Sequence, residues 1–162
     1  MLTEAQVRNA RARAAERLAA AGIALTPAEI AQIEIADFGL GRLEQIGLEV
    51  VVYVNTQRVC AKELVLFPGQ ICPEHRHPPF DGTPGKEETF RVRAGLAHVY
   101  IGGSTSAITL LPGEQLTVPP NTLHWFQAGP EGAIVSEFST HSRDDLDIFS
   151  DPAISRATVV GP

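Results

Sequence analysis

The chain has 162 residues, 44% of them hydrophobic and 20% charged, with a formal net charge of −6. This length and composition indicate one globular domain, residues 1–162, rather than a disordered chain. No apolar stretch approaches the roughly 20 residues of a transmembrane helix, and no apolar signal region is present near the start, so we expect a cytoplasmic protein with no membrane partner. The early arginines are interleaved with glutamates, and without a basic stripe we expect no nucleic-acid partner.

Two helices are predicted to form an extension over residues 1–40. Thr3 and Gln6 have the spacing of a capping box, and small apolar residues then recur at steps of three and four, which predicts an amphipathic helix over 4–21. Pro27 follows a threonine and begins a second helix that runs to about Ala36. Because the apolar stripe of the first helix is thin, it must pack against the barrel or a second subunit, and we expect a homodimer.

From Leu48 onward the pattern changes to short β-branched and aromatic runs separated by turn residues, which is typical of an all-β fold. About eight antiparallel strands around a ligand-holding interior form a jelly-roll barrel, which we place at 48–160. The tail after Thr140 is acidic and ends in a segment, PAISRATVVGP, that is predicted to add an edge strand. The predicted strands are 48–55, 58–66, 71–77, 87–94, 96–102, 107–111, 114–118, 122–128 and 131–139.

Three histidines and a glutamate are candidate metal ligands. Side chains alternate along a strand, so His75 and His77 emerge on one face about 7 Å apart and can bind the same ion. Glu88 and His124 complete the candidate set. Three imidazoles and one carboxylate leave coordination positions open, which suits Mn, Fe, Co or Ni as well as Zn, whereas a closed structural zinc site is usually rich in cysteine.

The two cysteines are predicted to be buried free thiols, because disulfides are rare in cytosolic proteins. Cys72 lies three residues before His75 and is therefore expected on the opposite face of the strand, where it cannot join the ligands. Cys60 is assigned no role.

The spacing of these residues resembles the two signatures of the cupin superfamily. One departure is Asn121, which stands at a turn glycine of the signature and tolerates positive φ. A second departure is the interval between His77 and Glu88, where residues 78–87, PPFDGTPGKE, replace a shorter connection and predict an extended loop beside the metal. The matching positions are Gly69, His75, His77, Glu88 and Gly95 in the first signature, and Gly113, Pro119 and His124 in the second.

Within the cupins, the chain resembles the D-lyxose ketol-isomerase family over roughly residues 48–160. The segments that carry this resemblance are PEHRHPPFDGTPGKEETF, SEFST at 136–140 and PAISR at 152–156. Its most specific element is a Lys-x-Glu after the histidine pair, here Lys86 to Glu88. The resemblance implies a cupin jelly roll that interconverts D-lyxose with D-xylulose and D-mannose with D-fructose, usually with manganese.

The resemblance also implies roles for individual residues. Glu137 matches the catalytic glutamate, and we expect it to be the base; its strand, AIVSEFS, is apolar. Lys86 is expected to act as the electrophile or to donate to a substrate oxygen, and Arg156 to anchor the sugar. His141 follows the Glu137 strand and is assigned to substrate binding, with a surface position as the alternative.

The chemistry agrees with these roles, because a 1,2-hydroxycarbonyl can chelate the ion through two adjacent oxygens, which stabilises an enediolate. Two other classes of function stay open. An Fe or Ni cupin dioxygenase uses the same ligands and is favoured by an apolar pocket with few acids. A non-catalytic cupin that binds a small ligand is the third candidate.

Overall fold

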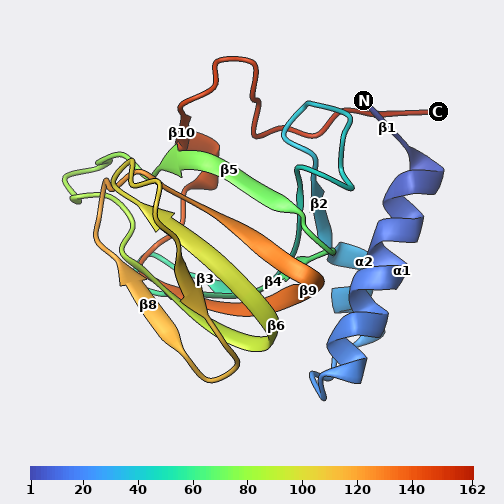
Figure 1. Ribbon diagram of the computed structural model, residues 1–162. Coiled ribbons are helices and arrows are strands. Elements are labelled where there is room, and N and C mark those ends of the chain that lie inside the picture. Colours follow the sequence, from blue (N-terminus) through green and yellow to red (C-terminus); the bar gives the residue numbers. More distant parts are fainter.

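The computed structural model describes residues 1–162 and confirms the predicted all-β fold with its two preceding helices (Figure 1). The helices are α1, Glu4–Ala20, and α2, Pro27–Gln32. The predicted capping box is present at the start of α1, where the Thr3 side chain accepts from the Gln6 backbone and the Gln6 side chain accepts from the Thr3 backbone. No helix is both long and apolar enough to cross a membrane.

Helix α1 lies against the outer face of the sheet (Figure 1). Its buried stripe of Val7, Ala10, Ala14 and Leu18 packs with sheet residues such as Val65 in one apolar layer. The thin stripe is therefore covered by the same chain, and it does not require a second subunit.

The prediction that the second helix continues to Ala36 is wrong. Helix α2 ends at Gln32, and strand β2, Glu34–Ala36, then pairs antiparallel with the edge of strand β3, Leu48–Asn55. Ile35 and Ala36 are buried in this arrangement. Burial against a sheet edge thus outweighs the helical tendency of these residues. The sequence pattern of so short a segment does not show that this edge is available.

The remaining strands form one antiparallel sheet that curls around an apolar interior. Along the main path the order is β10-β5-β9-β4-β3-β2, and β6 pairs with β7, β8 and β9. The strands are β4 Cys60–Leu66, β5 Ile71–Arg76, β6 Glu88–Ile101, β7 Ile108–Leu110, β8 Gln115–Val118, β9 His124–Ser139 and β10 Ile148–Phe149.

Two pairs of predicted strands are single long strands in the structure. The predicted runs 87–94 and 96–102 form β6, and the runs 122–128 and 131–139 form β9. The register between these two strands shifts on both sides of Gly95, whose φ is +70° and whose added Cβ would lie 2.0 Å from the Gly132 carbonyl oxygen. The glycines therefore mark bends at which a continuous strand turns, and the sheet can curl there.

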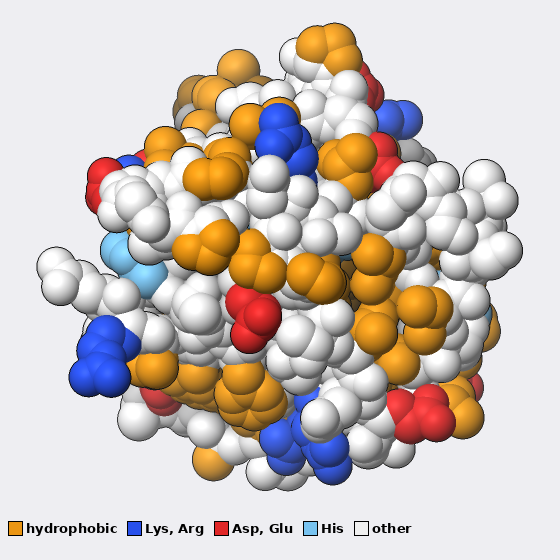
Figure 2. Space-filling view, turned by 90° about the vertical axis from the view of Figure 1, so that its left-hand side faces the viewer, with side chains coloured by type: hydrophobic (Ala, Val, Ile, Leu, Met, Phe, Trp, Pro, Cys, Tyr) orange, Lys and Arg blue, Asp and Glu red, His pale blue; other side chains and the backbone are white.

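The end of the chain forms strand β11, Val160–Gly161, which pairs in parallel with strand β1, Leu2–Thr3. The predicted tail strand is present, but it joins the N-terminus instead of the barrel, and the two ends of the chain lie side by side (Figure 1). On the molecular face in Figure 2, hydrophobic side chains form a band across the middle, while lysine and arginine side chains lie in separate groups.

Candidate active site

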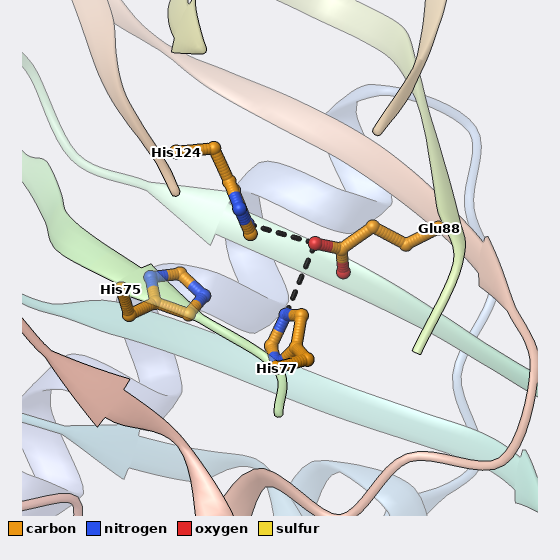
Figure 3. Close-up of side chains that lie close together, drawn as sticks. All are labelled: His75, His77, Glu88 and His124. Atoms are coloured by element: carbon orange, nitrogen blue, oxygen red, sulfur yellow. Dashed lines mark hydrogen bonds and ion pairs between the residues drawn. The ribbon is translucent and has the colours of Figure 1, made fainter. Parts of the chain in front are cut away.

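The four candidate metal ligands meet inside the curled sheet (Figure 3). His75 lies on β5 with His77 directly after it, while Glu88 and His124 begin β6 and β9. All four are buried, and one potential ligand atom from each lies within 4.8 Å of the others. Glu88 Oε1 is 2.8 Å from His124 Nε2 and 3.1 Å from His77 Nε2. Residues that are far apart in the sequence therefore form one cluster of three nitrogens and a carboxylate.

Hydrogen bonds orient all three imidazoles in the same way. Nδ1 of His75 donates to the Pro73 carbonyl at 2.8 Å, and Nδ1 of His124 donates to the Thr122 carbonyl at 2.9 Å. Nδ1 of His77 contacts the Asp147 carboxylate at 2.5 Å. Bonds of this kind set the tautomer and leave each Nε2 lone pair for a metal.

A further observation indicates that the cluster can hold a divalent cation. His124 Nε2 is buried and has no hydrogen-bond partner. Because Nδ1 donates to the Thr122 carbonyl, Nε2 of the neutral ring carries a lone pair, which the Glu88 carboxylate 2.8 Å away cannot satisfy. A buried nitrogen without a partner is costly, and a cation in the cluster would satisfy it. The donor set of three imidazoles and one carboxylate suits Mn, Fe, Co, Ni or Zn.

The charges inside the cluster set the protonation of the histidines. Burial lowers the pKa of His75 well below its usual value, and neighbouring His124 and His77 lower it further. Burial opposes the charge of His77 as well, but the Glu88 carboxylate and the bond to Asp147 outweigh it and raise the pKa of His77 to about 9. Without a cation, both ring nitrogens of His77 are therefore protonated at neutral pH, and a cation that binds Nε2 must displace the proton there.

The prediction that Cys72 lies on the opposite face of the strand from His75 is wrong. The expected alternation fails because β5 holds an extra residue between Cys72 and His75, whereas β9 has Phe126 and His124 two residues apart. This bulge returns Cys72 to the face of His75, where it lines the cavity. It lies outside the ligand cluster, and it and Cys60 are buried free thiols, as predicted.

A cavity of about 40 Å³ adjoins the cluster and is lined by Lys86 and Glu137. Lys86 Nζ lies 3.0 Å from Glu137 Oε1 and 2.8 Å from Glu88 Oε2. Burial alone would lower the pKa of Lys86, but the carboxylates of Glu137, Glu88 and Asp144 raise it well above its usual value. Lys86 is therefore a buried ammonium group, which can donate hydrogen bonds but cannot serve as a base.

The long loop over residues 78–87 brings Lys86 into this position. Part of its extra length forms a local turn, in which Thr83 donates its backbone N–H to the Phe80 carbonyl at 2.8 Å. The chain then passes close to His77 at Gly85, where φ is +101° and an added Cβ would lie 2.4 Å from the His77 carbonyl oxygen. The extra residues thus fold on themselves, and a glycine permits the return to the cluster.

Three residues of the candidate site were not identified from the sequence: Lys62, Asp144 and Asp147, whose carboxylate contacts His77 Nδ1. Lys62 on β4 lies 3.6 Å from Glu137 Oε1 and 2.6 Å from Asp144 Oδ2, and both Lys62 and Asp144 line the cavity. Two ammonium groups therefore flank Glu137, in place of the apolar surroundings that its strand predicts. The signal for Lys62 was its place on the inward face of β4, between Cys60 and Leu64.

The two predicted sugar-binding residues differ in position. Arg156 lines the cavity, forms an ion pair with Glu34 and lies 3.8 Å from Asp144 Oδ2. His141 is not part of the lining. Its ring meets Phe80 edge-on, with the centroids 5.6 Å apart, so the structure does not bring it to the cluster.

Comparison with known proteins gives close relatives, although no family model matches the chain. The chain is 55% identical to the D-lyxose/D-mannose isomerase of Thermosediminibacter oceani, over 96% of this chain and 97% of that protein. It is 54% identical to the D-lyxose ketol-isomerase of Cohnella laeviribosi, over 94% of each.

Solved structures with low sequence identity share the fold. The L-ribose isomerase of Acinetobacter sp. DL28 in complex with L-ribose has a TM-score of 0.84 at 15% identity, over 99% of this chain and 98% of that one. An RmlC-like cupin from Shewanella frigidimarina has a TM-score of 0.53 at 23% identity, over 71% of this chain and 89% of that one. The curled antiparallel sheet with a histidine and glutamate cluster inside it is a cupin, as predicted.

Within the cupins, identity above half over nearly the full length decides the family. The chain belongs to the D-lyxose ketol-isomerase family, which confirms the predicted family and the predicted enzyme class, a sugar ketol-isomerase.

Proposed function

We propose that the protein is a metal-dependent isomerase that interconverts D-lyxose and D-xylulose, and also D-mannose and D-fructose. The names of its relatives support the two aldoses. The observation that carries the proposal is the buried pair of Lys86 and Glu137 beside the ligand cluster, at 3.0 Å from each other. Aldose–ketose isomerisation needs these two groups, a base that moves a proton between two carbons and a donor for the oxygens.

Glu137 is the proposed base, and its contacts leave one oxygen available. Lys86, Lys62 and Ser139 all approach Oε1 of this carboxylate. Oε2 can therefore take the proton from C2 of the aldose and return it to C1. The two ammonium groups and the Ser139 hydroxyl hold the carboxylate in place during the transfer.

Lys86 is the proposed donor to the sugar oxygens, since its raised pKa keeps it charged. His75, His77, Glu88 and His124 would hold the cation, for which we propose Mn²⁺. When bound, the cation supplies positive charge beside the two adjacent oxygens of the sugar. Arg156, which also lines the cavity, is proposed to anchor a sugar hydroxyl, and His141 would contribute only if the sugar extended beyond the present lining.

The cavity has apolar walls as well as ionic ones, and its ionic groups favour isomerisation over oxygen chemistry. A cupin dioxygenase would be expected to have an apolar pocket with few acids, whereas Lys62, Lys86 and Glu137 occupy the space next to the ligands here. A non-catalytic binding cupin would have no use for a carboxylate that is held between two ammonium groups.

We also propose that the protein forms a homodimer through the outer face of its sheet. Val54 and Phe138 lie in one row of this face, on either side of Ala61, and are 38% and 50% exposed. A second copy would cover these apolar side chains. Phe138→Asp is expected to convert the dimer to a monomer in sedimentation experiments, and an unchanged mass would contradict this interface.

The isomerase proposal is tested with metal-free protein that is reloaded with Mn²⁺ and supplied with D-lyxose or D-mannose. We expect ketose to form, and Zn²⁺ to support less turnover. In the variant Glu137→Gln, which removes the proposed base, turnover should fall by about 10²–10⁴-fold while the metal content stays the same. No ketose from either sugar, together with oxygen uptake on an aromatic substrate, would refute the proposal in favour of a dioxygenase.

A further inference from the structure

The cavity beside the ligand cluster is too small for the proposed substrate. Its volume is about 40 Å³. This is room for a few water molecules, whereas pockets that bind small molecules measure about 300–1,000 Å³. A sugar can reach Glu137 and Lys86 only if part of the cavity wall moves.

A second hollow lies directly outside one wall of the cavity. This groove has a volume of about 620 Å³. Lys62, Asp144 and Arg156 line both the cavity and the groove. These three side chains are therefore the partition between a space that is large enough for a sugar and the reactive groups.

The groove is lined mostly by side chains that can hydrogen-bond. Besides the partition, its polar residues are Glu34, Asn55, Ser142, Asp145 and Ser155. Both signs of charge are present, and the hydroxyl and amide groups act as donors and as acceptors. This chemistry suits a neutral molecule with many hydroxyl groups.

The partition is held together by the carboxylate of Asp144, which interacts with the side chains of Lys62 and Arg156. Asp144 accepts from Lys62 at 2.6 Å, and Arg156 lies 3.8 Å from the same carboxylate. The segment that carries Asp144 and Arg156 runs from the end of β9 past the two-residue strand β10 towards the N-terminus (Figure 1). Only side-chain contacts join Lys62, Asp144 and Arg156, so changes of side-chain rotamer can separate them without moving the barrel strands.

We propose that the groove is the entrance through which a small polyhydroxylated substrate reaches the cavity, and that Lys62, Asp144 and Arg156 are its gate. The part of this proposal that makes the entrance the route of a sugar rests on the proposed function. Hydroxyl groups of the entering molecule would replace the hydrogen bonds of the gate while it is open.

The test uses Cys72, which lines the cavity, as a reporter of access. In a Cys60→Ala background Cys72 is the only thiol. The variant Ala157→Trp fills the groove without changing the gate or the cavity, and Ala153→Trp is the matched control on an exposed residue outside the groove. Val52→Trp fills the groove from β3 and serves as a second variant.

The first measurement is the rate at which methyl methanethiosulfonate labels Cys72. Because labelling requires access to the thiol, we expect at least about tenfold slower labelling when tryptophan replaces Ala157 or Val52. The Ala153→Trp control should be labelled at the parental rate. Equal rates in the blocked and control variants would overturn the entrance, whether or not the protein isomerises a sugar.

The second measurement is kcat/KM for D-lyxose with Mn²⁺-loaded enzyme. Blocking the groove should lower it by about tenfold with unchanged metal content, because the reacting groups are untouched. Unchanged kcat/KM in both blocked variants would overturn the entrance as the route of the sugar. If the parental protein forms no ketose but the blocked variants are labelled slowly, the isomerase proposal fails and the entrance to the cavity is supported.

Discussion

Glu49 is a fully buried carboxyl group outside the active site, and it makes the stability of the protein depend on pH. It lies on the face of β3 that α1 covers. Gln70 Nε2 donates to its Oε1 at 3.3 Å, and its Oε2 has no hydrogen bond. Burial therefore raises the pKa of Glu49 from its ordinary 4.5 to about 8, although Gln70 and the charge of Arg13 act in the opposite direction.

The sign of the effect follows from this raised pKa. Between the two pKa values the folded protein holds a proton on Glu49 that the unfolded chain has lost, so the contribution of Glu49 to stability is greatest below pH 4.5 and falls as the pH rises to about 8. At about 1.4 kcal/mol per pH unit, the loss between about pH 5.5 and pH 8 is ~3 kcal/mol. Glu49→Gln removes the titration but keeps the shape of the side chain.

Urea unfolding of metal-free protein at about pH 5.5 and pH 9 measures this loss. The free energy of unfolding of the Gln variant, relative to the parent, should rise by ~3 kcal/mol between the two pH values. Other groups titrate equally in both proteins, so they cancel in the difference. The exposed Glu16 provides the control variant Glu16→Gln, which should show no such rise. A constant difference between Glu49→Gln and the parent at both pH values would refute the reasoning.

Three further changes test the site and the bend of the sheet. Asp147→Asn should weaken metal binding by about 10–100-fold, because the carboxylate holds the ring of His77; competition with a fluorescent chelator measures the affinity, and an unchanged value would contradict the role. His124→Ala should lower metal content and turnover together, and elemental analysis that finds full loading would remove His124 from the ligands. Gly95→Ala should lower the free energy of unfolding by more than about 1 kcal/mol, because the residue has positive φ and no space for a Cβ. Gly103→Ala, with a φ of +74° but open surroundings, is the control, and an equal loss in urea unfolding would show that the close contact is unimportant.

Features that depend on local geometry could be predicted from the sequence. The capping box of Thr3 and Gln6, the start of the second helix at Pro27 and the change to strand periodicity at Leu48 all depend on neighbouring residues. The four candidate ligands were also identifiable, because the cupin spacing places them at the ends of strands that pair with each other. The metal itself and the roles of Glu137, Lys86 and Arg156 stay predictions.

Features that depend on contacts between distant segments were decided only by the tertiary structure. The turn of Glu34–Ala36 into a strand required the edge of β3, and the position of Cys72 required a bulge against β9. Lys62 and Asp144 meet because the tail folds back over the barrel. The sequence by itself thus determined the helix caps, the strand periodicity and the identity of the donors. The folded chain decided their surroundings, because charge, burial and access at a buried site come from segments that spacing along the chain does not relate.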